Sequence, residues 1–408
     1  MTAQFDRRRV CALTLAALAC AAAAAAAEPE HDITSVQDFD ELWRTLDERY
    51  CFFGEKATDW KKVRAVYRPQ AANAQTDEQY VAVLHRTLNE LYDPHTRLSD
   101  APASFPRSPP YDLWIERTPG AARIVSVKPD SAASAAGLKP GDLVVAAEGM
   151  AIERAAAAHR PICLKHPDPA AEDYAWAAAV AGVRGQDRRL RVRSADGSER
   201  EVVLGKPPDA SGNAVSWRGL VGGFGYIRIP SFAGAAAVTQ FDDALAALRD
   251  TRGLIIDVRA NGGGDTAVAR PIMGRFITER RPYAKMRRRQ GRGLSPFWTE
   301  WVEPRGPFTY GAPVVVLADR WSASMAEGFP MGMRGIGRAK VVGTPMMGLG
   351  AAVFPLRLDR TGVAAQYSAE PVYDVGGAPR WTMRPDVEVG LGGDILAAGL
   401  SELRRLTA

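Results

Sequence analysis

A serine and a turn of three glycines are the residues of this chain with the most evident capacity for chemistry. Glycines 262–264 follow the short apolar run Leu254–Val258, and Ser324 follows a second such run, Val314–Leu317. Acyl transfer needs a nucleophile and N–H donors for the oxyanion that develops on the attacked carbonyl. Ser324 could supply the nucleophile. The amide of Met325, at the expected start of a helix, could donate to the oxyanion with the helix dipole behind it.

The two apolar runs must position these groups. Both are short, β-branched and bounded by turn residues, as is typical of buried strands. Ligands of open α/β sheets gather at the carboxyl ends of strands, so the glycine turn and the serine are expected to meet there. Gly263 or Gly264 would then provide a second amide donor. Two other interpretations stay open: an anion-binding glycine turn and a serine that only caps a helix.

Three segments together resemble the motifs of the C-terminal processing peptidases, also called tail-specific proteases. RANGGGD (residues 259–265) is similar to their D-R-x-N-x-G-G turn. SASMAE (322–327) is similar to their nucleophile motif, with Ser324 three residues before Glu327. GRAKVVGTPMMGLG (337–350) is similar to the segment that follows it. The resemblance implies an α/β multidomain serine peptidase with a catalytic core of the crotonase/ClpP type.

This sequence departs from the family's pattern at the general base. Bacterial members carry a lysine where this chain has Leu349, and leucine cannot accept a proton. Relatives of the tricorn type use a histidine from the N-terminal region, and His95 in LYDPHTRL fits that role because imidazole titrates near neutral pH. A lone histidine after a helix can equally be a capping or surface residue. Arg380 and Trp381 stand where a supporting acid is expected, which leaves three candidate carboxylates: Glu327, Glu370 and Asp374.

The first 27 residues predict a signal peptide. An arginine cluster at 7–9 precedes the alanine-dominated run Val10–Ala27, which ends in small residues, so the mature chain would begin at Glu28 in the periplasm or outside the cell. An uncleaved anchor and lipidation at Cys20 are the alternatives. Removal of three arginines and Asp6 lowers the formal net charge from +5 to +3. This mild excess argues neither for nucleic acid nor for an anionic membrane surface as a partner, and no nucleic-acid partner is expected.

Three regions are expected after the signal. Residues 28–108 form an N-terminal helical region, residues 109–206 resemble a PDZ domain, and residues 207–408 form the catalytic domain. The helical region rests on apolar residues at helical spacing, which are Phe39, Leu42, Leu46 and Tyr50 in one run and Tyr80, Val83, Leu84, Leu88 and Leu91 in another.

PDZ domains add an extended peptide to a sheet edge and capture its terminal carboxylate on backbone amides. Leu113, Trp114 and Ile115 stand where that carboxylate-binding loop would be. A PDZ domain that serves only as a spacer is the alternative. The basic run Lys285–Gly293 is expected to be a solvated loop, and Cys51 and Cys163 could pair in an oxidising compartment.

Three functions compete for this combination of motifs. The first is an exported serine endopeptidase that uses Ser324 and His95 on a polypeptide substrate, with the substrate's C-terminus as a candidate contact. The second is an inactive relative that binds peptide tails, and the third is a carrier of a small apolar ligand. The sequence contains no metal-ligand cluster or nucleotide fingerprint, so no metal or cofactor is expected. No other apolar run is long enough to span a membrane.

Overall fold

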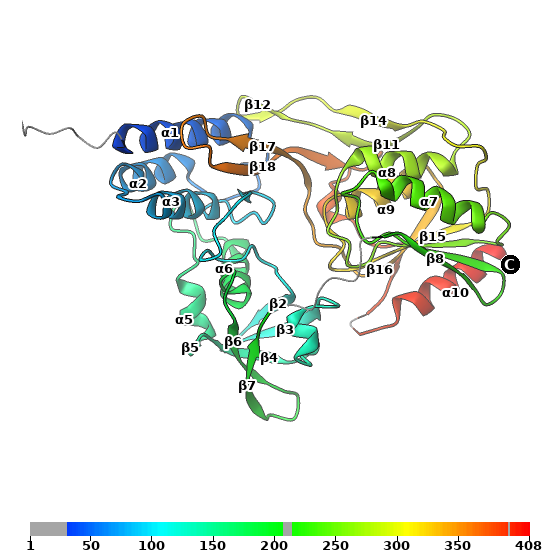
Figure 1. Cartoon of the computed structure of the whole chain (residues 1–408), viewed down its shortest axis with the longest axis horizontal. Coiled ribbons are helices and arrows are strands. Elements are labelled where there is room, and N and C mark those ends of the chain that lie inside the picture. Colours follow the sequence, from blue (N-terminus) through cyan, green and yellow to red (C-terminus); the bar gives the residue numbers. More distant parts are fainter. Residues whose placement is uncertain (1–30, 207–213, 391) are drawn as a thin grey trace, which may run out of the picture.

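The computed structural model describes residues 31–206, 214–390 and 392–408. The predicted signal peptide therefore lies outside the described residues. Figure 1 shows helices α1–α3 at one end of the molecule, a large α/β body at the other, and the region from β2 to β7 beneath the junction between them. Each of these parts has its own cluster of buried apolar side chains.

The N-terminal part consists of α1 (His31–Arg49), α2 (Trp60–Ala72) and α3 (Asp77–Asn89). The apolar residues that predicted helices over the first and third of these segments are buried in one cluster, as expected of amphipathic helices. The second helix was not predicted. It begins where the Asp59 side chain accepts a hydrogen bond from the amide of Lys62.

The next part carries a sheet with the strand order β2-β3-β4-β6-β7, in which β5 pairs with β4. The elements are β2 (Leu113–Thr118), β3 (Ala121–Val127), α4 (Ala132–Ala135), β4 (Leu143–Ala147), β5 (Met150–Ala151), α5 (Ile152–Ala157), α6 (Pro169–Ala181), β6 (Arg188–Arg193) and β7 (Glu199–Leu204).

The α/β body is built on a six-stranded sheet with the order β19-β16-β15-β10-β9-β8, parallel except for β8. Every residue of β10 and β15 is buried, because helices cover both faces of the sheet. The strands are β8 (Ser216–Leu220), β9 (Phe224–Arg228), β10 (Leu254–Asp257), β15 (Val314–Ala318), β16 (Ala339–Gly343) and β19 (Val387–Glu388).

The two faces of this sheet have separate apolar cores. Ile256 and Val316 pack in the cluster that includes α7 (Ala236–Ala247), α8 (Thr266–Met273) and α9 (Met325–Gly335). Their neighbours Ile255 and Val315 pack instead against α10 (Ile395–Thr407). The period of two along each strand thus divides one apolar run between two layers.

A second sheet joins the body to the N-terminal helices. Its order is β1-β18-β11-β14, with β17 also paired to β18. Strand β18 (Ala364–Tyr373) pairs with β1 (Arg97–Leu98), which begins two residues after His95, and with β17 (Ala351–Arg357). Strand β11 (Arg281–Met286) pairs with β14 (Trp298–Val302) and with the end of β18. One long strand therefore connects the histidine segment with the body that carries Ser324.

The expectation of a solvated basic loop at Lys285–Gly293 was wrong. Residues Arg289–Gln290 form β12, which pairs with β13 (Gly293–Leu294) and lies beside α1. Arg289 lies over the ring of Phe53 at 4.8 Å, and Arg288 forms an ion pair with Glu370 at 3.0 Å. The arginines therefore anchor an arm between the body and the helices (Figure 1), which sequence composition alone does not reveal.

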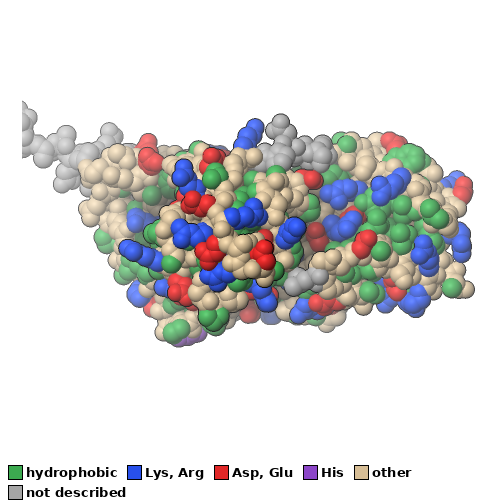
Figure 2. All heavy atoms as spheres, turned by 90° about the horizontal axis from the view of Figure 1, so that it is seen from below, with side chains coloured by type: hydrophobic (Ala, Val, Ile, Leu, Met, Phe, Trp, Pro, Cys, Tyr) green, Lys and Arg blue, Asp and Glu red, His purple; other side chains and the backbone are tan. Residues whose placement is uncertain are grey.

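The cysteines do not pair in this structure, since Cys51 and Cys163 are both free and buried. Burial raises the pKa of the Cys163 thiol to about 12. Among the described residues, no helix combines the length and apolar character that a membrane crossing requires. On the face drawn in Figure 2, basic and acidic side chains are interspersed.

Candidate active site

Ser324 has the strained backbone expected of a positioned nucleophile. It lies between β15 and α9 with φ 54° and ψ −113°, a conformation that is rare for any residue other than glycine. Strain of this kind costs roughly 1–3 kcal/mol and is kept where the surrounding structure enforces it, often at functional sites. The strand-to-helix turn fixes the backbone of Ser324 before any substrate binds.

Ser322 is part of the structure that enforces this turn. Its hydroxyl donates to the carbonyl of Val258 at 2.8 Å and accepts from the amide of Asp319 at 3.0 Å. The Asp319 carboxylate in turn accepts from the amides of Ala260 and Trp321. Ser322 is completely buried, so its hydroxyl ties the serine loop to the glycine turn.

The glycine turn lies directly against Ser324. A Cβ on Gly263, which has φ +99°, would come within 2.9 Å of the Ser324 Cβ and 3.0 Å of the Met325 nitrogen. A Cβ on Gly264, which has φ +140°, would come within 2.2 Å of the carbonyl carbon of Phe232. Neither position has room for a side chain, which explains the two glycines.

The two glycine amides are not equivalent. The Gly263 amide donates to Oδ1 of Asn261 at 2.8 Å, and is therefore occupied. The amides of Gly264 and Met325 form no hydrogen bond with any described residue. These two amides border the same pocket as Ser324, and are placed to serve a developing oxyanion.

The pocket next to Ser324 has a volume of about 500 Å³. Its walls come from the glycine turn, α9, β11 and β17, and are mainly small or sulfur-containing side chains. Representative wall residues are Ala284, Met286, Met331, Ala351 and Val353. An apolar cavity beside the nucleophile can hold a substrate side chain and exclude water from the reacting bond.

Glu327 lies one helical turn beyond Ser324 and is almost completely buried. Its carboxylate accepts hydrogen bonds from the amides of Ser324 at 2.9 Å, Gly348 at 3.0 Å and Leu349 at 2.8 Å. Burial raises the pKa of Glu327 to about 7, although the charge of Arg380 and these three amides oppose the shift. Glu327 thus fixes the nucleophile's own backbone and the loop that carries Leu349.

His95 is bonded to β18 of this body but forms no hydrogen bond with Ser324. Gln366 on β18 donates to its carbonyl, and its amide donates to Oδ1 of Asp93. The ring forms no hydrogen bond with any described residue, and its Nδ1 is buried without a partner. Burial, together with the charges of Arg380 and Arg97, lowers the pKa of His95 to about 4, and the charge of Asp93 opposes this shift. The imidazole is therefore neutral at pH 7 and able to accept a proton.

None of the three candidate carboxylates supports the His95 ring. Glu327 is occupied by the three amides, Glu370 pairs with Arg288, and Asp374 accepts from the amide of Ala378. The buried carboxylate nearest in sequence, Asp93, accepts instead from the hydroxyls of Thr96 and Ser368. These bonds fix the segment that carries His95 rather than the orientation of its ring.

Comparison with known proteins shows which families this chain resembles. Residues 223–389 match Peptidase family S41, and residues 35–89 match the Tricorn protease C1 domain. The carboxy-terminal processing protease CtpB of Bacillus subtilis is 27% identical over 272 residues, which cover 64% of this chain and 52% of CtpB. The part of the chain that carries Ser324 is thus similar to the S41 peptidases.

Other similarities agree with that assignment. The Tricorn protease of Thermoplasma acidophilum is 26% identical over 220 residues, which cover 50% of this chain and 19% of the relative. This chain therefore spans about half, or less, of the length of these relatives. Mature CPAF complexed with lactacystin has a TM-score of 0.60 at 17% identity, with 92% of this chain and 98% of that chain covered. The photosystem II D1 C-terminal processing protease gives 0.58 at 19% identity, with the same coverage. These structures share the mixed α/β fold.

The candidate site contains one group whose importance was not predicted. Arg380 is 5% exposed and borders the pocket of Ser324. Its Nη2 donates to the carbonyls of Leu349 and Ala351. In the sequence, Arg380 is marked only as a departure from an expected acid. The signal for its importance is a cation at a position with no evident acidic partner.

The predicted carboxylate-binding residues are part of a strand rather than a loop. Leu113, Trp114 and Ile115 begin β2, and Leu113 is buried in the core of its sheet. Trp114 and Ile115 border a groove of about 970 Å³ that also receives Tyr174 of α6 and Met347 of the loop after β16. This groove opens beside the region that matches Peptidase family S41.

Trp321, three residues before the nucleophile, connects the groove to the serine loop. Its indole N–H donates to the hydroxyl of Ser126 at 2.9 Å, and its ring meets the edge of Trp114 with 6.2 Å between centroids. The same short loop therefore carries Ser324 and contacts both β2 and β3.

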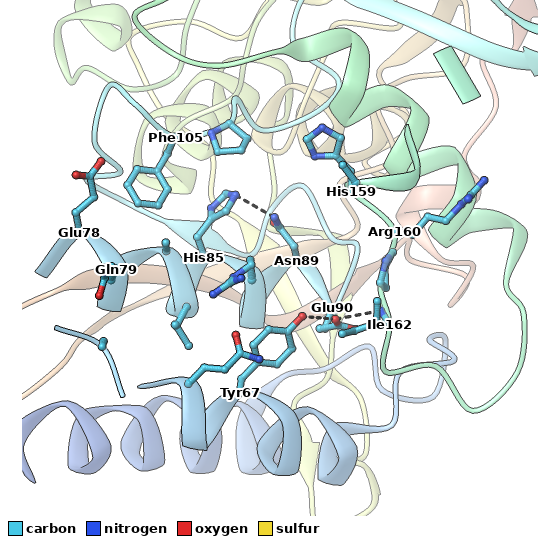
Figure 3. A pocket seen from close by; sticks show the side chains of 18 of the residues that line it. Tyr67, Glu78, Gln79, His85, Asn89, Glu90, Phe105, His159, Arg160 and Ile162 are labelled. Atoms are coloured by element: carbon cyan, nitrogen blue, oxygen red, sulfur yellow. Dashed lines mark hydrogen bonds between the residues drawn. The ribbon is translucent and has the colours of Figure 1, made fainter. Parts of the chain in front are cut away.

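A pocket of about 910 Å³ lies away from this site, between α2, α3 and the segment 158–162 (Figure 3). His85 forms a hydrogen bond with Asn89 there, and burial lowers the pKa of His85 to about 4. Glu90 accepts from the hydroxyl of Tyr67 and from the amides of Ile162 and Cys163. The polar groups that line this pocket mainly form hydrogen bonds with one another. No group of three or more His, Cys, Asp or Glu side chains in the described ranges could hold a metal ion.

Proposed function

We propose that this chain is an exported serine endopeptidase that cleaves polypeptides with Ser324 as the nucleophile and His95 as the general base. One observation carries this proposal. The backbone of Ser324 is strained, and the neighbouring amides of Met325 and Gly264 have no hydrogen-bond partner among the described residues. A capping serine requires neither the strain nor the unoccupied donors.

In the proposed reaction, neutral His95 takes the hydroxyl proton of Ser324 as the oxygen attacks the peptide carbonyl. The carbonyl oxygen becomes an oxyanion, which the amides of Met325 and Gly264 stabilise. His95 then gives its proton to the leaving amine, and an acyl-enzyme forms. Water, activated by the same imidazole, releases the acyl group and restores Ser324. The imidazole must move toward Ser324 when substrate binds, which a small closure of the N-terminal helices along β18 would achieve.

We further propose that residues 109–206 are a PDZ domain and that the α/β body has the crotonase/ClpP type of core. The strand β2 and helix α6 border a groove of suitable size for an extended peptide, which would add to the edge of β2. The contact between Trp321 and Ser126 favours delivery of that peptide to Ser324.

Labelling with a serine-directed fluorophosphonate tests the proposal. The purified chain is expected to form a covalent adduct at Ser324, identified by peptide mass. Ser324→Ala should abolish the label and Ser322→Ala should keep it. A folded wild-type protein that takes no label would contradict the assignment of Ser324 and favour a peptide-binding function.

A further inference from the structure

Arg380 is a buried cation at the wall of the pocket that contains Ser324. It lies in the short 3-10 helix Arg380–Thr382, and only 5% of its surface is exposed. Removing a guanidinium from water is costly unless its N–H groups and charge are compensated. The partners of Arg380 therefore show whether it has a purely structural task.

Only one of its three nitrogens donates to a described residue. Nη2 donates to the carbonyls of Leu349 and Ala351, which fixes the start of β17. Nε is buried without a partner, and Nη1 forms no hydrogen bond with any described residue. Nη1 lies 3.4 Å from the position of a Cβ built on Gly328, and Gly328 borders the Ser324 pocket. The absent side chain at Gly328 leaves this donor open toward the pocket.

The nearest acids do not occupy these donors. Glu327 acts on Arg380 through its charge, but its own hydrogen bonds come from three backbone amides. Asp265 also borders the pocket, yet its carboxylate caps α8 by accepting from the amide of Ala267. The pocket thus combines apolar walls with a guanidinium whose pairing is incomplete.

We propose that this pocket receives a carboxylate of the polypeptide substrate and that Arg380 is the residue that selects it. The carboxylate would belong either to a Glu or Asp side chain near the scissile bond or to the last residue of the substrate. It would accept from the free donors of Arg380, while the methionine and alanine walls contact the methylene groups. This inference rests on the proposed function for the identity of the substrate, although the binding it describes needs no catalysis.

Peptide binding to the full chain carrying Ser324→Ala separates the two ideas. The probes are fluorescent peptides of alanine and serine with Glu, Gln or Leu at each of the last four positions in turn, ending in a free carboxylate or an amide. We expect one carboxylate to strengthen binding by about 10- to 100-fold, as for a charge-assisted bond to a buried cation. Preference for Glu over Gln identifies a side chain, and loss on amidation identifies the terminus.

The decisive comparison is between arginine variants in the same background. Arg380→Gln should remove the carboxylate preference, whereas Arg380→Lys should keep part of it because the charge is retained. Only a preference that depends on residue 380 counts, because the β2–α6 groove could also bind a free terminus. If Arg380→Gln folds and leaves every preference unchanged, Arg380 does not select the substrate.

The control for folding is fluorophosphonate labelling of each arginine variant with Ser324 restored. In the chain that keeps Arg380, labelling of Ser324 without any carboxylate preference would overturn the inference and leave the peptidase proposal intact. Carboxylate preference without labelling would support the pocket and overturn the peptidase proposal.

Discussion

The two halves of the candidate site are held in very different ways. The half that carries Ser324 is fixed by bonds from three directions, through Asp319, Asn261 and Glu327. The half that carries His95 is fixed only at its backbone, and its ring has no partner among the described residues. If Ser324 and His95 act as proposed, the oxyanion donors are in place before substrate binds, whereas the His95 ring must still be oriented. This difference suggests that substrate binding completes the site.

The largest expected effect comes from removing the nucleophile. Ser324→Ala should lower peptide cleavage by on the order of 10,000-fold or more, because no covalent intermediate can form. Steady-state cleavage of a quenched fluorescent peptide measures this. Unchanged turnover in the folded variant would place the nucleophile elsewhere.

Removing the proposed base should lower activity almost as much, if His95, whose ring has no described partner, is catalytic. His95→Ala is expected to approach Ser324→Ala in kcat/KM, because members of a catalytic unit do not act independently. His159→Ala, a histidine near the distant pocket, is the matched control and should keep normal activity. If the two histidine variants are equally active, His95 is a structural residue.

The glycine turn tests how far the ordered half tolerates change. Gly263→Ala would push a methyl group toward Ser324 at a φ of +99°, and should reduce turnover by roughly 100- to 1,000-fold by displacing the oxyanion donors. Gly262→Ala is the control, since a Cβ there meets nothing within 4 Å. Equal turnover in both variants would make the turn purely structural.

The pH dependence of kcat/KM tests the His95 half of the site separately from the Ser324 half. His95 must be neutral to act, and burial lowers its pKa to about 4, so kcat/KM should rise with pH through about 4 and not through 6.5. Between about pH 4 and 6.5, His95 is protonated in the unfolded chain but not in the folded protein. The contribution of His95 to stability is therefore lost as pH falls. If kcat/KM instead rises through about pH 6.5, the His95 ring is more exposed to water during turnover.

Glu327 should produce the opposite pH dependence of stability. Its pKa is raised to about 7, so the folded protein binds the extra proton between about 4.5 and 7, and stability from this group falls as pH rises. A shift of this size corresponds to roughly 3 kcal/mol. Denaturant titrations at several pH values should show that Glu327→Gln removes this slope, whereas the exposed Glu48→Gln keeps it.

The smallest change in activity is expected at Ser322. Ser322→Ala removes the hydroxyl that donates to Val258 and should cost about 1–3 kcal/mol of stability while most of the turnover remains. Thermal unfolding and peptide cleavage of the same sample measure both. A stable but inactive variant would reverse the roles of the two serines.

Much of the ordered half could be predicted from sequence. Leu254–Asp257 and Val314–Ala318 form strands as their β-branched, apolar composition indicated, and α9 begins directly after Ser324. These features depend on local patterns: the periodicity of apolar residues, the backbone freedom of glycine and the residues that begin or end a helix. Such information is contained within a few consecutive residues.

Only the tertiary structure decided which groups are free to act. The choice between Gly263 and Gly264 depends on Asn261, which occupies one amide and leaves the other. The pKa of His95 depends on its burial near Arg380, and its position on a bond from Gln366, 271 residues away. Hydrogen-bond occupancy and desolvation arise from contacts between distant segments, so no local pattern encodes them. The sequence specified the reactive groups, and the fold determined which of them lack partners.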